Sequence, residues 1–152
     1  MLNLLDILQL LPFIGHNIAL FSGGLFAGAA VYVSLTECPP RSVLGPREMM
    51  LLTHSIAART DALLLVLSAA TAASAIMAAI VGGGSLWMSG GLTQLGATVL
   101  LLTDVQGVSK RLASLSLEEK EATGEKLLQR RAGQIAILAL FGLGAQCQFI
   151  LA

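Results

Sequence analysis

The sequence predicts an all-α integral membrane protein: a four-helix antiparallel bundle with both termini on the non-cytoplasmic side. Three observations predict this class. Of the 152 residues, 55% are hydrophobic and only 12% are charged, whereas soluble domains carry about 25% charged residues. The mean hydropathy is +0.81, and the apolar runs approach the roughly 20 residues that a membrane-spanning helix needs. The charged residues gather in segments between those runs.

The first span is expected at residues 13–35, inside a stretch without Asp, Glu, Lys or Arg. The leucine-rich residues 1–11 fit either a short interfacial helix or the first turns of this span. Gly24 and Gly28 form a GxxxG pattern, which allows two helix backbones to approach closely. Asn17 lies seven and eleven residues before them and shares their face. We expect Asn17, Gly24 and Gly28 to form a helix-packing face, most simply against helices of the same chain.

The second span is expected at residues 62–81, as the last part of one long helix that begins near Arg47 after a proline-rich loop. Residues 82–85, three glycines and a serine, predict a tight turn. The third span is expected at residues 86–103. Ser116 and Glu119 form a capping box that opens a helix running into the fourth span, residues 132–151. Residues 1–152 then form a single transmembrane domain.

The charges predict how the bundle sits in the membrane. All nine Lys and Arg lie in two segments, residues 36–61 and 104–131. The positive-inside rule places both segments in the cytoplasm, or its organellar equivalent, and both termini outside. A bacterial inner membrane or an organellar inner membrane is expected, with the lipid bilayer as a partner. The chain lacks a basic patch interleaved with aromatic residues, so no nucleic-acid partner is expected.

Polar residues near the outer boundary provide the first candidate site. His16 and Asn17 follow each other about one turn inside that boundary, where a polar pair usually faces the bundle interior or a cavity. His16 could be an axial ligand to a haem or chlorophyll, a proton-transfer group, or simply a hydrogen-bonding partner of another helix. The two cysteines form no CxxC motif and no metal-ligand spacing is present. No metal and no cofactor are therefore predicted, and a haem or chlorophyll on His16 stays a possibility.

The second group of candidates lies at the inner boundary. His54 and Asp61, with Arg59 nearby, could form an acid–base site. Alternatively, Arg47, His54 and Asp61, which are seven positions apart, form a solvated or interfacial stripe on one face of the helix. Asp104, where the third span ends, is either a catalytic base or a carboxylate paired with an arginine such as Arg111, seven residues later. The candidate catalytic residues are thus His16, Asn17, His54 and Asp104.

The first span and the segment after the third carry a family resemblance. Residues 24–35, GLFAGAAVYVSL, followed by Glu37-Cys-Pro-Pro-Arg41, resemble the first helix of the anthrone-oxygenase-like family, small four-helix membrane proteins mostly of unknown function. Residues 107–112, GVSKRL, look like the family's Pro-Thr-Asn-Lys-Arg-Leu, with Ser109 in place of the Asn. Before the fourth span the family shows a Trp and a Leu-His that residues 128–134, LQRRAGQ, lack. The resemblance implies the four-helix fold more directly than an oxygenase activity.

Three functions remain open from the sequence. The first is a non-catalytic membrane subunit or scaffold that packs against the transmembrane helices of other subunits in a larger complex. The second is an anthrone-oxygenase-like enzyme that oxidises a polycyclic aromatic, as the resemblance implies. The third is a haem- or chlorophyll-binding bundle that uses His16. His16 and Asn17 lie near one boundary and His54 and Asp104 near the other, so one pocket cannot hold all four.

Overall fold

Four long helices make up the part of the chain that the computed structural model describes, residues 4–37, 46–114 and 120–152. Side chains are described for residues 10–36, 56–82, 84–112, 114, 123, 124 and 126–152. The helices are α1 (Leu4–Glu37), α2 (Pro46–Ala78), α3 (Gly84–Leu100) with its continuation α4 (Gln106–Ser114), and α5 (Lys120–Leu151). Segments of four of them, residues 10–36, 56–82, 84–112 and 126–151, are long and apolar enough to cross a membrane. The described chain is therefore an all-helical protein of the integral membrane class.

The expected spans 13–35 and 132–151 lie inside α1 and α5, whereas 62–81 and 86–103 run from α2 and α3 into the π-helical turns Ala79–Gly83 and Leu101–Val105. The helix predicted from Arg47 is α2, and the helix predicted to run through Arg131 is α5. Pro12 does not end α1, so the residues from Leu4 form the first turns of the long helix rather than a separate interfacial one. The capping box of Ser116 and Glu119 lies outside the described residues.

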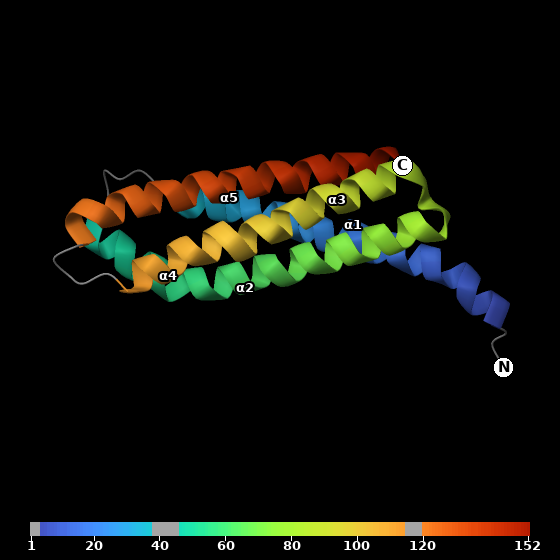
Figure 1. The fold of residues 1–152 in the computed structure, drawn as a ribbon, viewed down its shortest axis with the longest axis horizontal. Helices are drawn as coiled ribbons and strands as arrows, with labels where there is room; N and C mark the ends of the chain where they lie inside the picture. Colours follow the sequence, from blue (N-terminus) through green and yellow to red (C-terminus); the bar gives the residue numbers. More distant parts are fainter. Residues whose placement is uncertain (1–3, 38–45, 115–119) are drawn as a thin grey trace.

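The glycine turn between α2 and α3 forms where it was predicted. Gly82 and Gly84 have φ values of 124° and 81°, a region that glycine adopts without steric cost because it lacks a Cβ. The chain reverses there within a few residues. Figure 1 shows both termini at the same end of the bundle as this turn, with the N-terminal end of α1 extending beyond the other helices.

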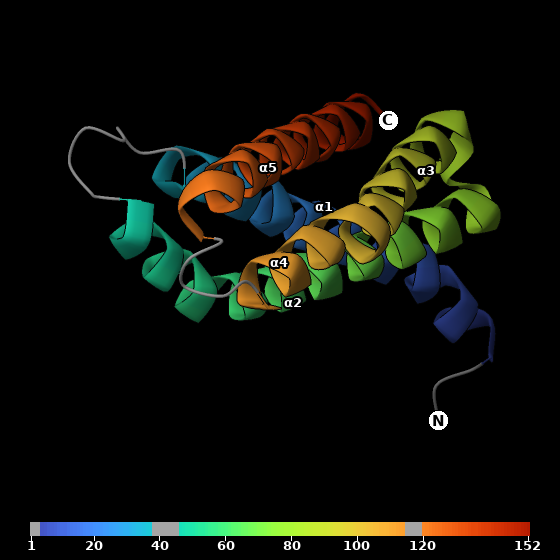
Figure 2. The same ribbon diagram turned by 60° about the vertical axis from the view of Figure 1, so that its left-hand side comes forward.

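The helices pack in a ring. α1 contacts α2 and α5, and α3 contacts the same two helices, whereas α1 and α3 lie diagonally across the bundle and meet through the rings of His16 and Trp87. Figure 2 shows this arrangement from another side. One core cluster fills the half of the bundle near the charged segments: Phe26, Ala30, Val33, Leu64, Ala97, Leu101, Val105, Ile135, Leu138 and Ala139. A second cluster fills the other half: Ala19, Ala75, Ala78, Trp87, Ala145 and Phe149.

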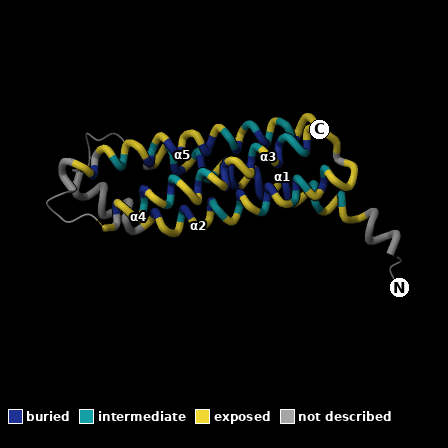
Figure 3. Tube along the Cα trace, in the orientation of Figure 1, coloured by how far each residue is buried: buried dark blue, intermediate teal, exposed yellow. Residues whose placement is uncertain are grey.

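The outer surface of the bundle is apolar. Figure 3 shows exposed positions alternating with buried ones along each helix, and many of the exposed side chains are large and hydrophobic, including Phe21, Val66, Leu140 and Ile150. A soluble protein does not expose contiguous apolar surface of this extent. In a membrane these side chains face lipid tails, so the same pattern is favourable there.

Candidate functional site

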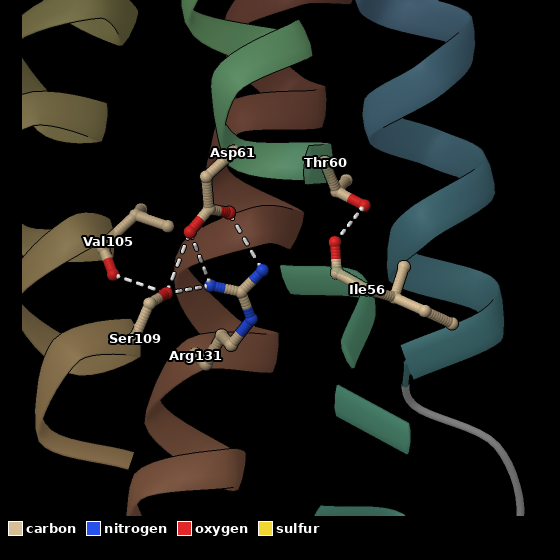
Figure 4. A network of polar contacts seen from close by, with 6 residues as sticks. All are labelled: Ile56, Thr60, Asp61, Val105, Ser109 and Arg131. Atoms are coloured by element: carbon tan, nitrogen blue, oxygen red, sulfur yellow. Dashed lines mark hydrogen bonds and ion pairs between the residues drawn. The ribbon is translucent and has the colours of Figure 1, made fainter. Parts of the chain in front are cut away.

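A buried ion pair joins α2 to α5 at the charged end of the bundle. Arg131 and Asp61 are 1% and 4% exposed. The guanidinium Nη2 donates to Asp61 Oδ1 over 2.7 Å, and Nη1 donates to Oδ2 over 3.0 Å (Figure 4). Two parallel hydrogen bonds between a guanidinium and a carboxylate fix both distance and orientation. The pair therefore holds α2 and α5, two diagonal helices, in one register through the centre of the bundle.

Ser109 of α4 completes this cluster, which we call the Asp61–Arg131–Ser109 site. Its Oγ lies 2.7 Å from Asp61 Oδ2 and 2.9 Å from the carbonyl oxygen of Val105, and it accepts a hydrogen bond from Arg131 Nη1. A hydroxyl has one proton, so Ser109 donates to either the carboxylate or the carbonyl at one time. The site thus connects three helices through charge-assisted hydrogen bonds.

A π-helical turn precedes Ser109 in the chain. Residues Leu101–Val105 form this turn between α3 and α4, and the backbone N–H of Gln106 donates to the carbonyl of Leu101. Turns of this kind insert an extra residue into a helix and often occur at functional sites. Here the turn sets the face that α4 presents to α2 and so the direction of Ser109. It also contains Asp104, the sequence-predicted candidate.

An apolar layer separates this site from the hydroxyl groups in the middle of the bundle. On α2, fully buried Leu64 lies between Asp61 and Ser68. Beyond it, Ser68 Oγ lies 2.8 Å from Thr98 Oγ1 and accepts from Gln94 Nε2 over 3.1 Å. The described interior therefore contains two separate polar layers. Of these two layers, only the one at the charged end contains an ion pair.

A third hydroxyl contact joins α1 to α2 at the middle of the bundle. Ser22 Oγ lies 2.9 Å from Thr71 Oγ1. Each hydroxyl also forms a hydrogen bond to a backbone carbonyl oxygen of its own helix. Hydrogen bonds between helices in a membrane are each worth only about 0.6–2 kcal/mol. These layers fix helix register and bring no titratable group into the middle of the bundle.

His16 and Asn17, predicted as a pair, point in different directions. The His16 ring lies against Trp87, with centroids 4.2 Å apart, and Trp87 stacks on Phe149 at 4.9 Å. His16 Nε2 is buried and has no hydrogen-bond partner in the described structure. Asn17 is exposed, and its amide donates to the carbonyl of Phe13 over 2.7 Å. The two residues therefore do not form a joint site within the chain.

The geometry around His16 bears on the haem and chlorophyll hypothesis. An axial ligand needs open space in front of its nitrogen for the macrocycle. His16 Nε2 is instead buried beside the Trp87 indole, so a macrocycle fits there only if Trp87 moves away. The described part of the chain also contains no group of three or more His, Cys, Asp or Glu residues able to hold a metal ion.

The inner candidates have other partners than those expected. Asp104 pairs with Arg130 at 3.2 Å, not with Arg111, and both side chains are about half exposed. Asp61 is buried against Arg131, so its expected place in a solvated stripe is wrong. Asp61 is buried because it lies on the side of the long α2 helix that faces the bundle interior. There the positive charge of Arg131 compensates the negative charge of its carboxylate. His54 lies on α2, but its side chain is not among those that the structure describes.

The predicted packing of Asn17, Gly24 and Gly28 within the chain is wrong. All three are exposed, and a Cβ added at either glycine would meet nothing within 4 Å. The neighbouring stripe packs instead: Gly23 is buried beneath Gln146, and Ala27 lies against Gly142 of α5. Both stripes of α1 consist of small residues, so composition alone did not distinguish them.

Arg131 and Ser109 were not singled out from the sequence as site residues. A signal for Arg131 exists, because it is the last charge before a long apolar run, and an arginine entering the membrane usually pairs within the bundle. Its partner Asp61 lies 70 positions away on a non-adjacent helix, which no spacing rule reaches. Comparisons with protein-family models, with curated proteins and with solved structures return no match for this chain.

Proposed function

We propose that this protein is a non-catalytic integral membrane subunit that docks a transmembrane helix of another subunit on the outer face of α1. This face, which we call the α1 outer face, consists of Asn17, Phe21, Gly24, Gly28 and Tyr32. These residues recur at three- and four-residue steps and therefore lie on one side of the helix. The observation that carries the proposal is the open space over Gly24 and Gly28.

The shape of this face suits a helix better than lipid alone. Phe21 and Tyr32 are 72% and 67% exposed and flank the two glycines along the helix. A notch of two glycines between two aromatic rings allows a second backbone to approach closely. Close approach matters in a membrane because helix association there depends on van der Waals packing and not on hydrophobic burial.

Asn17 provides a second, polar reason for a partner. Its side chain is exposed and makes a hydrogen bond only to the carbonyl of Phe13 among the described residues. An amide facing lipid tails is unfavourable, whereas the same amide can form a hydrogen bond across a helix–helix interface. The expected partner is thus an apolar transmembrane helix with small residues and a hydrogen-bonding group near its end.

Mild-detergent purification from the native membrane tests this function. We expect a partner protein to co-purify in fixed stoichiometry with the unmodified chain and to be lost when Gly24 and Gly28 are both replaced by Leu. Gly144→Leu is the matched control, because Gly144 on α5 is also a glycine with open space above its Cβ position. Purification of the unmodified chain alone, or equal loss of the partner in the control, contradicts the proposal.

We also infer the arrangement of the bundle in the membrane. Consecutive spans run antiparallel, with the segments 36–61 and 104–131 in the cytoplasm, or its organellar equivalent, and both termini outside. The support is the placement of all nine Lys and Arg in those two segments and the tendency of basic residues to stay on the cytoplasmic side. The membrane is then a bacterial inner membrane or an organellar inner membrane.

An anthrone-oxygenase-like enzyme is the second candidate function. One observation favours it: Ser109, where the resembling family has an Asn, forms a hydrogen bond to the buried Asp61 carboxylate. Oxygen uptake by the purified protein with a polycyclic anthrone tests this candidate. Uptake that is absent, or unchanged in Ser109→Ala, rejects it.

A further inference from the structure

His16 of α1 and Trp87 of α3 make a contact across the diagonal of the bundle, at the end that holds the glycine turn. Their ring centroids lie 4.2 Å apart, and the ring planes are tilted by 40°. Trp87 follows Gly84 of the turn by three residues, so the contact lies about one helical turn from the end of the bundle. It therefore links two helices that are not neighbours in the ring of four.

The two rings have apolar surroundings. Trp87 belongs to the core cluster of this half of the bundle, whose other buried members are Phe149 and alanines of α1, α2 and α5. The acidic side chains that the structure describes, Asp61 and Asp104, lie in the other half, at the charged end. Among the described side chains, none therefore offers a carboxylate to balance a positive charge on His16.

The other ionisable groups at this end of the bundle are exposed or distant. On α2 and α3, the described side chains of this half include none that titrates. On α5, Cys147 and the last residue, Ala152, are both exposed. The side chain of Asp6 on α1 lies outside the described ones, and its position is ten residues before His16, about 15 Å along a helix. His16 is thus the titratable group that the described core of this half contains.

The packing suits a neutral imidazole and not a charged one. His16 Nε2 is buried without a hydrogen-bond partner in the described structure. In a protonated ring both nitrogens are donors, and a buried charge without a partner costs far more free energy than a buried neutral group. The indole face of Trp87 attracts a cation, but it leaves the Nε2 proton without an acceptor. Protonation therefore favours a position in which the ring reaches water.

We propose that the His16–Trp87 contact is a pH-sensitive switch: neutral His16 holds α1 against α3, and the protonated ring leaves Trp87 and releases α1 at this end of the bundle. Histidine suits this role because its charge ordinarily changes between pH 5 and 8. The route to water is short, since His16 is only partly buried and α1 extends beyond the other helices at this end (Figure 1). The inference does not depend on docking at the α1 outer face.

Tryptophan fluorescence of the purified full chain in detergent micelles tests the switch, because Trp87 is the only tryptophan in the sequence and is 6% exposed. From pH 8 to pH 5 we expect its emission to move to longer wavelength and its quenching by acrylamide to rise, because the indole then meets water. His16→Phe keeps a ring beside Trp87 but takes up no proton, so its emission should be the same at both pH values. His16→Gln is a second variant that does not titrate and should behave alike.

Matched variants test whether other groups cause the response. His54→Phe removes the other histidine of the chain, and Asp6→Asn removes the acidic side chain of α1 that precedes His16. Both variants should respond to pH as the unmodified chain does. His16→Phe keeps Cys147 and the carboxylate of Ala152, so a response caused by either group would persist in it.

Each other outcome overturns the proposal. Emission that does not change with pH, or a response that persists in His16→Phe and His16→Gln, means that protonation of His16 is not the trigger. A response lost in His54→Phe or Asp6→Asn assigns the trigger to that residue. A fall in intensity without a wavelength shift or added acrylamide quenching means that the imidazolium stays on the indole. Loss of the helical circular-dichroism signal at the lower pH means that the whole chain unfolds instead of opening at one end.

Discussion

At the scale of single residues, the buried Asp61–Arg131 ion pair is sensitive to the loss of either partner. Replacing Asp61 by Asn leaves the buried guanidinium without its counter-ion, a change that costs about 3–5 kcal/mol in buried pairs. We expect Asp61→Asn to lower the unfolding temperature in detergent sharply. Asp104→Asn is the control, because its pair with Arg130 is about half exposed and such pairs contribute about 0–1 kcal/mol.

A double replacement separates the role of charge from that of packing. When both partners become apolar, as in Asp61→Leu with Arg131→Met, no unpaired charge remains, and exchanges of this kind are often neutral or stabilising. We expect the double variant to recover most of the stability that Asp61→Asn loses. If it unfolds as early as the single variant, the site has a role beyond mutual neutralisation, and the enzyme candidate gains support.

His16 allows a spectroscopic prediction at the same scale. Because its Nε2 is buried beside Trp87, we expect protein purified in mild detergent to show no Soret or chlorin absorbance band. A band that is present in the unmodified chain and lost in His16→Ala would contradict this expectation and would assign the axial ligand. Asn17→Ala is the comparison, since Asn17 neighbours His16 in sequence but its side chain is exposed.

At the scale of the helices, the two glycine stripes of α1 and α5 have opposite sensitivities. A Cβ at Gly142 would lie 2.9 Å from Phe26 Cδ1 and 3.1 Å from the Cα of Ala27, and backbone cannot move aside as a flexible side chain can. We expect Gly142→Ala to cost about 1–3 kcal/mol through overpacking. Gly24→Ala should leave the isolated chain unchanged or slightly more stable, because alanine favours a helix. Thermal unfolding of both variants measures this difference.

The helices themselves were predictable, whereas the faces through which they pack were not. Hydropathy and the glycines at positions 82–84 located α1, α2, α3 and α5 because a membrane imposes length and apolarity on every span. The choice between the Gly23/Ala27 stripe and the Gly24/Gly28 stripe depends instead on Gln146 and Gly142, which lie on α5, far away in the sequence. The periodicity of one helix contains no information about these partners.

The candidate site shows the same limit. The α2 periodicity grouped Asp61 with His54, since both lie on one face of one helix. The structure pairs Asp61 with Arg131 across the bundle, and a contact between residues 70 positions apart is set by the ring order of the helices. Individual buried charges could be suspected from the sequence, but their pairing required the three-dimensional arrangement.

At the scale of the whole molecule, the inferred sidedness follows from the charges and leads to a labelling prediction. Ser85, beside the turn between α2 and α3, and Ser114, at the end of α4, are both exposed and lie at opposite ends of the bundle. With Cys38 and Cys147 replaced by Ser, we expect a membrane-impermeant maleimide applied outside intact cells or organelles to modify Ser85→Cys but not Ser114→Cys.

Permeabilising the membrane should then make Ser114→Cys reactive as well, which controls for its accessibility. The physical reason is that moving nine Lys and Arg across the membrane is opposed by the positive-inside bias, whereas the ends with the turn and the termini carry none of them. The reverse labelling pattern would place the Asp61–Arg131–Ser109 site at the outer side of the membrane.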